Sequence, residues 1–210
     1  MGKRPQAKSD FSDEDADVRA LLERYRCPLP FHAVRTRLLG HIASPVSAIS
    51  PIDAVKGLWG GKLPEFETPA AAEEFMGTLV MGLWNKLTRH QERRVPFRLM
   101  RSTIAETREG LARITRVRRE ELDGFIAGLF GGKTSLYLPA PAQSALRVLS
   151  DIRGMLAGVH QLASNPEKSM PGDDVGGLLQ QNGELSKIAE TEMHAAVLAC
   201  AQERGGRTRR

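Results

Sequence analysis

The chain has 210 residues, of which 41% are hydrophobic and 26% are charged, and its formal net charge is +5. These proportions suit an ordinary globular protein, and the length allows one large domain or two small ones with a buried core. No window approaches the ~20 apolar residues of a membrane span, and the N-terminus lacks the apolar segment of a secretory signal, so we expect a soluble, cytoplasmic protein with no membrane partner.

Composition also favours helix over strand. Aromatic residues make up only 5% of the chain, whereas Ala, Leu, Arg and Glu, which are good helix formers, are plentiful. No stretch alternates apolar and polar residues for long enough to require a strand. The predicted fold class is all-α, a multi-helix, orthogonal or bundle-like domain of about seven helices.

The first two helices have clear limits. Residues 1–11 are polar and mixed in charge, which is typical of a disordered tail. An acidic first turn after Ser12 favours a helix start, because the helix dipole attracts negative charge there, and Pro28 ends this helix. A second helix is expected from about Phe31 to Ala43, before Ser44-Pro45.

The middle of the chain holds the strongest helix-start signals. Ser50-Pro51 and Thr68-Pro69 each combine a capping side chain with a proline at the first helical position. Gly60-Gly61 closes the first of these two helices, since glycine tolerates the left-handed cap. The second helix carries a wide apolar stripe interrupted by Gly77 and Gly82, which we attribute to the close approach of a neighbouring helix.

The basic character of the chain is concentrated in one segment. Between Arg89 and Arg119 there are ten arginines and three glutamates. From Pro96 onward, apolar residues keep to one side of a helical wheel and arginines to the other, which predicts a single long basic helix over residues 96–130. The arginines on its common face are the candidate polyanion- or partner-binding residues: Arg98, Arg101, Arg108, Arg116 and Arg119.

The last third of the chain sets the domain limits. A further helix follows Pro141, and SNPEKSMPGDDVGG marks a turn or linker. We therefore expect one helical domain over residues 12–163, a linker over residues 164–177, and a C-terminal helix over residues 178–204 that packs on the same domain. Gly205-Gly206 is expected to end that helix ahead of a basic tail, residues 205–210.

One motif is related to nucleotide binding. Ala127-x4-Gly132-Lys133-Thr134 is a permissive form of the phosphate-binding P-loop, which follows a buried strand and opens a helix. Here an amphipathic helix precedes the motif, and no helix start follows it at once. The pattern therefore favours a glycine helix stop followed by an exposed loop.

No other pattern indicates chemistry. The five histidines form no HxxxH or HExxH motif and do not pair with a cysteine, so no metal and no cofactor are expected. Cys27 and Cys200 are the only thiols, and we expect both to be reduced. No side chain is recognisable as an activated nucleophile, and the chain is predicted not to be an enzyme.

A set of residues in the first half of the chain matches the pattern of a known family. The set comprises Pro45, Ile49, Ser50-Pro51, Trp59, Gly60-Gly61, Pro64, Phe66, Glu73 and Asn85. Leu122-Asp123-Gly124-Phe125, with Gly128, matches a second helix of that pattern. Over residues 35–160 the chain therefore resembles the YecA/YgfB-like family of uncharacterised bacterial all-helical proteins.

The chain departs from that family in two places. Leu39-Gly40-His41 stands where an acidic-Gly-Phe pattern is usual, and the C-terminal zinc motif of some members is missing. The resemblance implies an all-helical, soluble protein that can form a homodimer. It implies no established activity and no catalytic residues, and no zinc is carried over.

Three functions are compatible with these observations. The leading expectation is a non-enzymatic cytoplasmic adaptor or accessory protein that binds an unknown partner protein. The first alternative is a nucleic-acid- or ribosome-associated protein that uses the Arg98–Arg119 face, weighed against a face that is only solvated or paired within the chain. The second alternative is a nucleotide-binding enzyme that uses the Lys133-Thr134 loop.

Overall fold

The computed structural model describes residues 11–45, 50–165, 167 and 175–207. Over these residues the chain contains no strand, and it forms seven helices if the continuous segment Pro69–Gln91 counts as one. The elements are α1 (Phe11–Arg24), α2 (Phe31–Ala43), α3 (Pro51–Leu58), α4 (Pro69–Met76), the π-helix η1 (Gly77–Trp84), α5 (Asn85–Thr88), the 3₁₀ turn η2 (Arg89–Gln91), α6 (Arg108–Phe130), α7 (Ala140–Ser164) and α8 (Val175–Arg207). The all-α class predicted from the sequence is confirmed.

Some expected boundaries fall outside the described residues. The tail at 1–11 lies almost entirely outside them, and so does most of the linker at 164–177. At the other end, α8 continues through Gly205-Gly206 to Arg207, so the expected helix stop there is wrong. A glycine pair permits a left-handed cap but does not impose one, since glycine in a helix costs only about 1 kcal/mol relative to alanine.

The helix starts predicted at Ser50-Pro51 and Thr68-Pro69 are confirmed. The hydroxyl oxygen of Ser50 accepts a hydrogen bond from the Asp53 amide at 3.1 Å, and the hydroxyl of Thr68 does the same for Ala71 at 3.1 Å. Each cap satisfies a backbone donor that has no partner inside the helix. At the end of α6, Gly131 has φ of 56° and closes the helix in the left-handed conformation.

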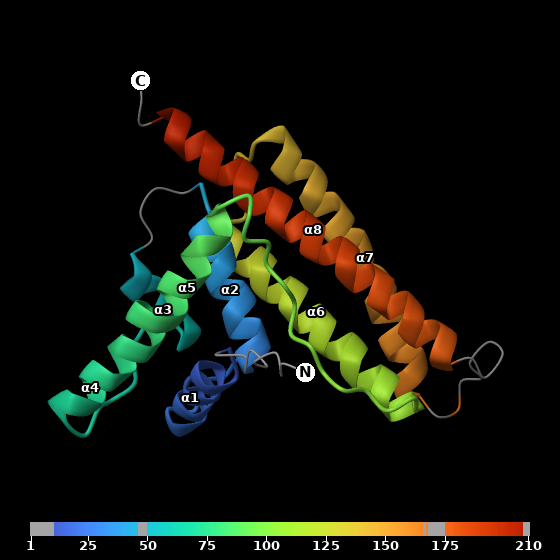
Figure 1. Cartoon of the computed structure of the whole chain (residues 1–210), viewed down its shortest axis with the longest axis horizontal. Coiled ribbons are helices and arrows are strands. Elements are labelled where there is room, and N and C mark those ends of the chain that lie inside the picture. Colours follow the sequence, from blue (N-terminus) through green and yellow to red (C-terminus); the bar gives the residue numbers. More distant parts are fainter. Residues whose placement is uncertain (1–10, 46–49, 166, 168–174, 208–210) are drawn as a thin grey trace, which may run out of the picture.

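The closest helix pair is α2 against α6. A Cβ atom at Gly128 would lie 2.0 Å from the carbonyl oxygen of Arg37, and one at Gly40 would lie 2.2 Å from the carbonyl oxygen of Phe125. A Cβ at Gly124 would similarly meet the backbone of Ala33 at 2.6 Å. Only glycine lets the two backbones approach this closely. The α2–α6 pair is therefore the centre of the fold, and α7 and α8 cover α6 on its other side (Figure 1).

A second unit is the rod formed by α4, η1, α5 and η2, which runs without a break from Pro69 to Gln91 (Figure 1). The rod does not contact another helix through its glycines, because a Cβ at Gly77 would meet nothing within 4 Å and one at Gly82 only the Gly77 carbonyl oxygen at 3.4 Å. The expected close approach of a neighbouring helix is wrong. Both glycines instead lie within the π-helix η1, which widens the turn locally.

The rod is attached to the rest of the molecule by an aromatic cluster. The ring of Phe75 lies 5.0–5.3 Å, between centroids, from those of Tyr25, Trp59 and Phe66. The indole N–H of Trp59 also donates to the Tyr25 carbonyl oxygen at 2.8 Å. The cluster joins α1, α3 and α4 to one continuous hydrophobic core that extends to α8.

Residues 96–107, here called the strap, are extended rather than helical, so the single helix predicted over residues 96–130 is wrong in its first third. The helix begins only at Arg108, after Thr107, whose hydroxyl oxygen accepts from the Gly110 amide at 3.1 Å. Phe97 and Leu99 are buried while Arg98 is exposed, an alternation with the period of an extended chain. The strap crosses α6 on its way from the rod (Figure 1).

Side chains of α6 and α8 hold the backbone of the strap. The Met100 amide donates to the Glu121 carboxylate at 2.9 Å, and the Met100 carbonyl accepts from Arg118 at 2.8 Å. The Leu99 amide donates to Glu190 at 2.9 Å. Glu121 is fully buried, and its charge is balanced by the Arg118 guanidinium. Because an extended segment cannot satisfy its own backbone groups, this buried ion pair supplies the partners that a helix would have provided.

Candidate anion-binding cleft

The five candidate arginines do not share a helix face. Arg98 and Arg101 lie on the strap, whereas the other three lie on α6. Arg98 is exposed and forms an ion pair with Glu190 of α8 at 2.7 Å. Arg101 is exposed and forms no ion pair with a described carboxylate. The continuous basic stripe expected from the sequence depended on helical geometry through residues 96–107, which the strap does not have.

The three arginines of α6 have separate roles. Arg108 donates to the carbonyl oxygens of Leu162 and Ala163 at 2.6 and 3.1 Å, and so ties the start of α6 to the end of α7. Arg119 is half-buried, and its Nε has no hydrogen-bond partner. Arg116 is the exposed member of the three. None of them lines the cleft described next.

Arg98 and Arg101 instead line a cleft of about 650 Å³ between α1, α2, the end of the rod and the strap. Its size falls within the range of small-molecule and peptide side-chain pockets. Six cationic side chains surround it: Arg19, Arg35, Lys86, Arg89, Arg98 and Arg101. Arg19, Arg35, Lys86 and Arg89 were not among the candidates predicted from the sequence, because they come from α1, α2 and the rod, which meet only in the folded chain.

Most of this positive charge is not neutralised locally. Among the side chains that the structure describes, the only carboxylate that lines the cleft is Asp15, which pairs with Lys86 at 3.4 Å. Arg98 has Glu190 as its partner. The other four arginines form no ion pair with the described carboxylates: Arg19, Arg35, Arg89 and Arg101. The cleft therefore carries a clear excess of positive charge, which attracts anions.

The base of the cleft is apolar. Leu83, Leu87 and Leu99 line it and are almost completely buried, so they lie beneath the charged rim. Further apolar lining comes from Val95, Pro96 and Met100. A cleft of this composition fits a ligand that carries both apolar and anionic groups. The apolar groups would contact the apolar base, and the anionic groups would contact the cationic rim.

His90 also lines the cleft but adds no positive charge at neutral pH. Its Nδ1 donates to the Val95 carbonyl at 2.9 Å, and its ring meets Phe97 edge-on at 5.2 Å between centroids. Burial lowers the pKa of His90 below its ordinary value. The positive field of the cleft at neutral pH therefore comes from guanidinium and ammonium groups.

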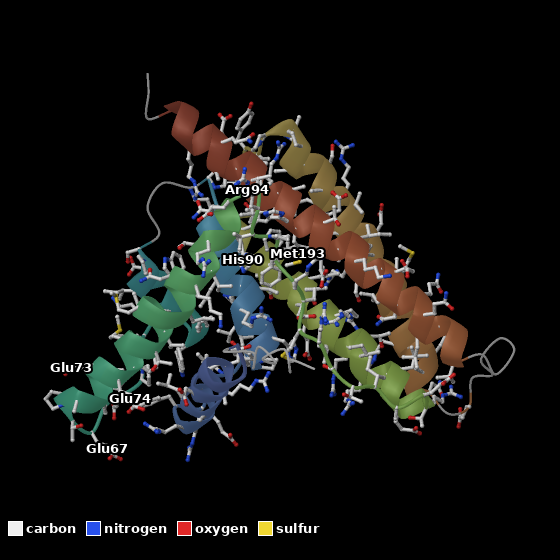
Figure 2. The ribbon with its side chains drawn as sticks, viewed as in Figure 1. Glu67, Glu73, Glu74, His90, Arg94 and Met193 are labelled. Carbon is white, nitrogen blue, oxygen red and sulfur yellow. The ribbon has the colours of Figure 1, made fainter. Side chains whose placement is uncertain are left out.

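Charge is separated along the rod. Figure 2 shows Glu67, Glu73 and Glu74 at the α4 end, whereas His90 and Arg94 lie at the opposite end, near the start of the strap. Arg94 is exposed, as is its neighbour Arg93. The basic surface therefore extends from the cleft over the turn that follows η2.

A second cavity of about 410 Å³ lies near Cys27, His32 and Met100. His32 Nε2 lies 2.6 Å from a carboxylate oxygen of Glu120. Burial raises the pKa of the Cys27 thiol, and it raises that of Cys200 to about 11. Neither thiol is thus activated as a nucleophile. No disulfide joins the two cysteines.

The Lys133-Thr134 segment is an exposed loop after α6. The next helix, α7, begins only at Ala140, and a helix rather than a strand precedes the loop. This geometry lacks the helix N-terminus that binds phosphate in a P-loop. Among the residues that the structure describes, no group of three or more His, Cys, Asp or Glu side chains could hold a metal ion, and no helix is long and apolar enough to cross a membrane.

No protein-family model, curated protein or solved structure matches this chain. The resemblance of residues 35–160 to the YecA/YgfB-like family therefore stays a prediction. The case for a function rests on the cleft alone.

Proposed function

We propose that the protein is a non-enzymatic adaptor whose basic cleft receives an acidic, amphipathic segment of a partner protein. The observation that carries this proposal is the set of four arginines around one cleft that have no ion-pair partner among the described carboxylates: Arg19, Arg35, Arg89 and Arg101. Like charges held together in this way raise the free energy of the unbound protein, and an acidic ligand relieves that repulsion.

The apolar base of the cleft favours a protein segment over a nucleic acid. Val95, Pro96 and Met100 leave apolar surface accessible in the cleft, which complements apolar side chains of a peptide, as in the binding of amphipathic helices to grooves. A phosphate backbone needs the cations but makes no use of such a base. Single-stranded nucleic acids also bind through aromatic rings, and the nearby Phe97 is fully buried. The nucleic-acid alternative is therefore the second candidate and an outcome of the experiment below.

The experiment compares three synthetic ligands by fluorescence anisotropy. The first is a helical peptide with leucines on one face and glutamates on the other, the second is an equally charged peptide without leucines, and the third is a single-stranded oligonucleotide. We expect the amphipathic peptide to bind most tightly, because only it uses both the apolar base and the basic rim. Preferential binding of the oligonucleotide, with a steep loss of affinity as salt is raised, would replace this proposal with the nucleic-acid alternative.

Variants identify the binding surface. Arg89→Glu and Arg101→Glu reverse charges on the rim of the cleft, and both residues are exposed, so neither change should disturb folding. Arg116→Glu is the matched control, because it makes the same charge change on an exposed arginine outside the cleft. We expect the first two variants to lose peptide binding and the control to keep it. Equal losses in all three would show that only net charge matters.

A further inference from the structure

Arg35 differs from the other arginines of the cleft because it is partly buried while they are exposed. Its guanidinium carbon lies 5.2 Å from the ring centroid of Phe97 and 5.9 Å from that of Phe31. One of its terminal nitrogens donates to the Arg98 carbonyl oxygen at 3.4 Å. These contacts hold the guanidinium group between α2 and the strap and engage one of its five N–H donors.

Arg19 reaches the same place from α1. Its guanidinium carbon lies 4.9 Å from the Phe31 centroid, and a terminal nitrogen lies 3.2 Å from the Met100 sulfur. One phenylalanine ring thus supports two guanidinium groups. Burial has the largest effect on the pKa of Arg35 and lowers it. Asp15 and Glu121 raise this pKa, and the positive charge of Arg19 lowers it by the smallest amount. The two guanidinium groups thus repel each other beside the Phe31 ring, and the nearby carboxylates offset that repulsion.

The carboxylates near Arg35 are each paired with another cation. Asp15 and Glu121 attract the Arg35 guanidinium, but neither forms an ion pair with it. Asp15 is already paired with Lys86, and Glu121 with Arg118. Arg19 and Arg35 accordingly line the same cleft with N–H donors that no described carboxylate engages in an ion pair.

From this arrangement we propose that Arg19 and Arg35 form a pocket for a phosphomonoester, so that the partner segment is recognised through a phosphorylated side chain. This inference rests on the proposed function. A phosphomonoester carries close to two negative charges at neutral pH and three acceptor oxygens, which matches two guanidinium groups in charge and donor geometry. A carboxylate carries one charge and two oxygens, so it engages fewer of the N–H donors of the two guanidinium groups.

The test uses three versions of the amphipathic acidic peptide, which differ only in a central residue that is phosphoserine, glutamate or serine. Binding is measured by fluorescence anisotropy at constant ionic strength. We expect the phosphoserine peptide to bind at least about tenfold more tightly than the glutamate peptide, the effect of one or two charge-assisted hydrogen bonds.

Arg35→Gln and Arg19→Gln should each abolish this preference, whereas Arg116→Gln should preserve it. Arg19 is exposed, so its replacement keeps the test informative even if Arg35→Gln lowers the melting temperature. Arg35→Lys keeps the positive charge but loses the planar arrangement of guanidinium N–H donors. It should therefore retain only part of the preference for the phosphoserine peptide.

The outcomes separate this inference from the proposed function. If all three peptides bind equally well, or if the preference survives in both Arg19→Gln and Arg35→Gln, the phosphomonoester pocket is refuted while the adaptor proposal stands. If none of the peptides binds, both the phosphomonoester pocket and the adaptor proposal are refuted.

Discussion

The α-carbon of Gly128 lies so close to the carbonyl oxygen of Arg37 that an added Cβ would be 2.0 Å from that oxygen. The same Cβ would lie 3.0 Å from the His41 amide nitrogen. Both neighbours are backbone atoms of α2, which cannot move aside as a side chain would. The contact between α2 and α6 therefore depends on the absence of a side chain at this position.

Gly128→Ala should consequently lower the free energy of unfolding by about 3 kcal/mol or more, because the helices must separate to admit the methyl group. Gly154→Ala is the matched control, since a Cβ at that exposed position on α7 would meet nothing within 4 Å. We expect this second change to raise stability by up to about 1 kcal/mol through helix propensity. Urea denaturation of both variants measures the difference; equal effects would contradict the packing described for α2 and α6.

The strap supplies a second prediction, because it is held by the buried Arg118–Glu121 pair. Glu121→Ala leaves the Arg118 charge uncompensated, and we expect a loss of about 3–5 kcal/mol in stability. It also removes the acceptor for the Met100 amide. Hydrogen exchange at that amide should therefore be faster in the variant.

Glu190→Gln is the comparison variant for the strap. It keeps an acceptor for the Leu99 amide but loses the ion pair with exposed Arg98. We expect a stability loss under about 1 kcal/mol, since ion pairs with an exposed partner contribute little. If Met100 exchange were unchanged in Glu121→Ala, the strap would not depend on the buried pair.

His41 gives a pH-dependent prediction. Burial, followed by the nearby charge of Arg37, lowers its pKa from 6.5 to about 4, and neither ring nitrogen has a hydrogen-bond partner. Between these two pH values the unfolded chain binds more protons than the folded one. The contribution of neutral His41 to the free energy of unfolding is therefore fully present above pH 6.5. It decreases by up to about 3 kcal/mol as the pH falls toward 4.

His41→Phe should remove this contribution to the pH dependence. At pH 7 the variant should be about as stable as the wild type, because no hydrogen bond of the ring is lost. Thermal unfolding of both proteins between pH 4 and 8 measures the effect. If the melting temperatures of the two proteins changed equally with pH, His41 would titrate normally in the folded protein.

Arg108 and Arg116 look equivalent on a helical wheel and should behave differently. Arg108→Ala removes hydrogen bonds to the Leu162 and Ala163 carbonyls, and we expect a loss of about 2 kcal/mol in stability without a change in ligand affinity. Arg116→Ala should change neither quantity by more than a few tenths of a kcal/mol, as expected for an exposed side chain. Thermal melts together with the peptide-binding assay separate the two.

The sequence was sufficient at three helix limits that a single residue determines. Ser50, Thr68 and Gly131 act through their own hydroxyl group or backbone freedom, and the helix limits at these residues could be read directly. The strap could not be read in this way, because its apolar residues fit both a helical and an extended period over so short a length. The alternation of Phe97 with Arg98 and Leu99, followed by a capping threonine at 107, was the available signal.

The cleft was beyond sequence analysis for a different reason. Arg98 and Arg101 were identified as binding candidates from their charge, but Arg19 and Arg35 belong to helices that carry no unusual concentration of arginine. Their role depends on Phe31, which supports both guanidinium groups, and on carboxylates that pair with other cations. The contact of Arg35 with Phe31 is local to α2, whereas the contacts of Arg35 with Phe97 and of Arg19 with Met100 join elements distant in sequence.

The α2–α6 contact also bears on how quickly the chain reaches its native state. All-helical domains usually fold rapidly, because most of their contacts join residues close in sequence. Here the whole segment from Ser44 to Thr107 lies between the two helices that pack most closely. A large chain loop must close before the glycine contacts can form, and that closure costs conformational entropy. We therefore expect refolding measured by stopped flow to be slower than is usual for a helical bundle of this length, and the Gly154→Ala variant to leave that rate nearly unchanged.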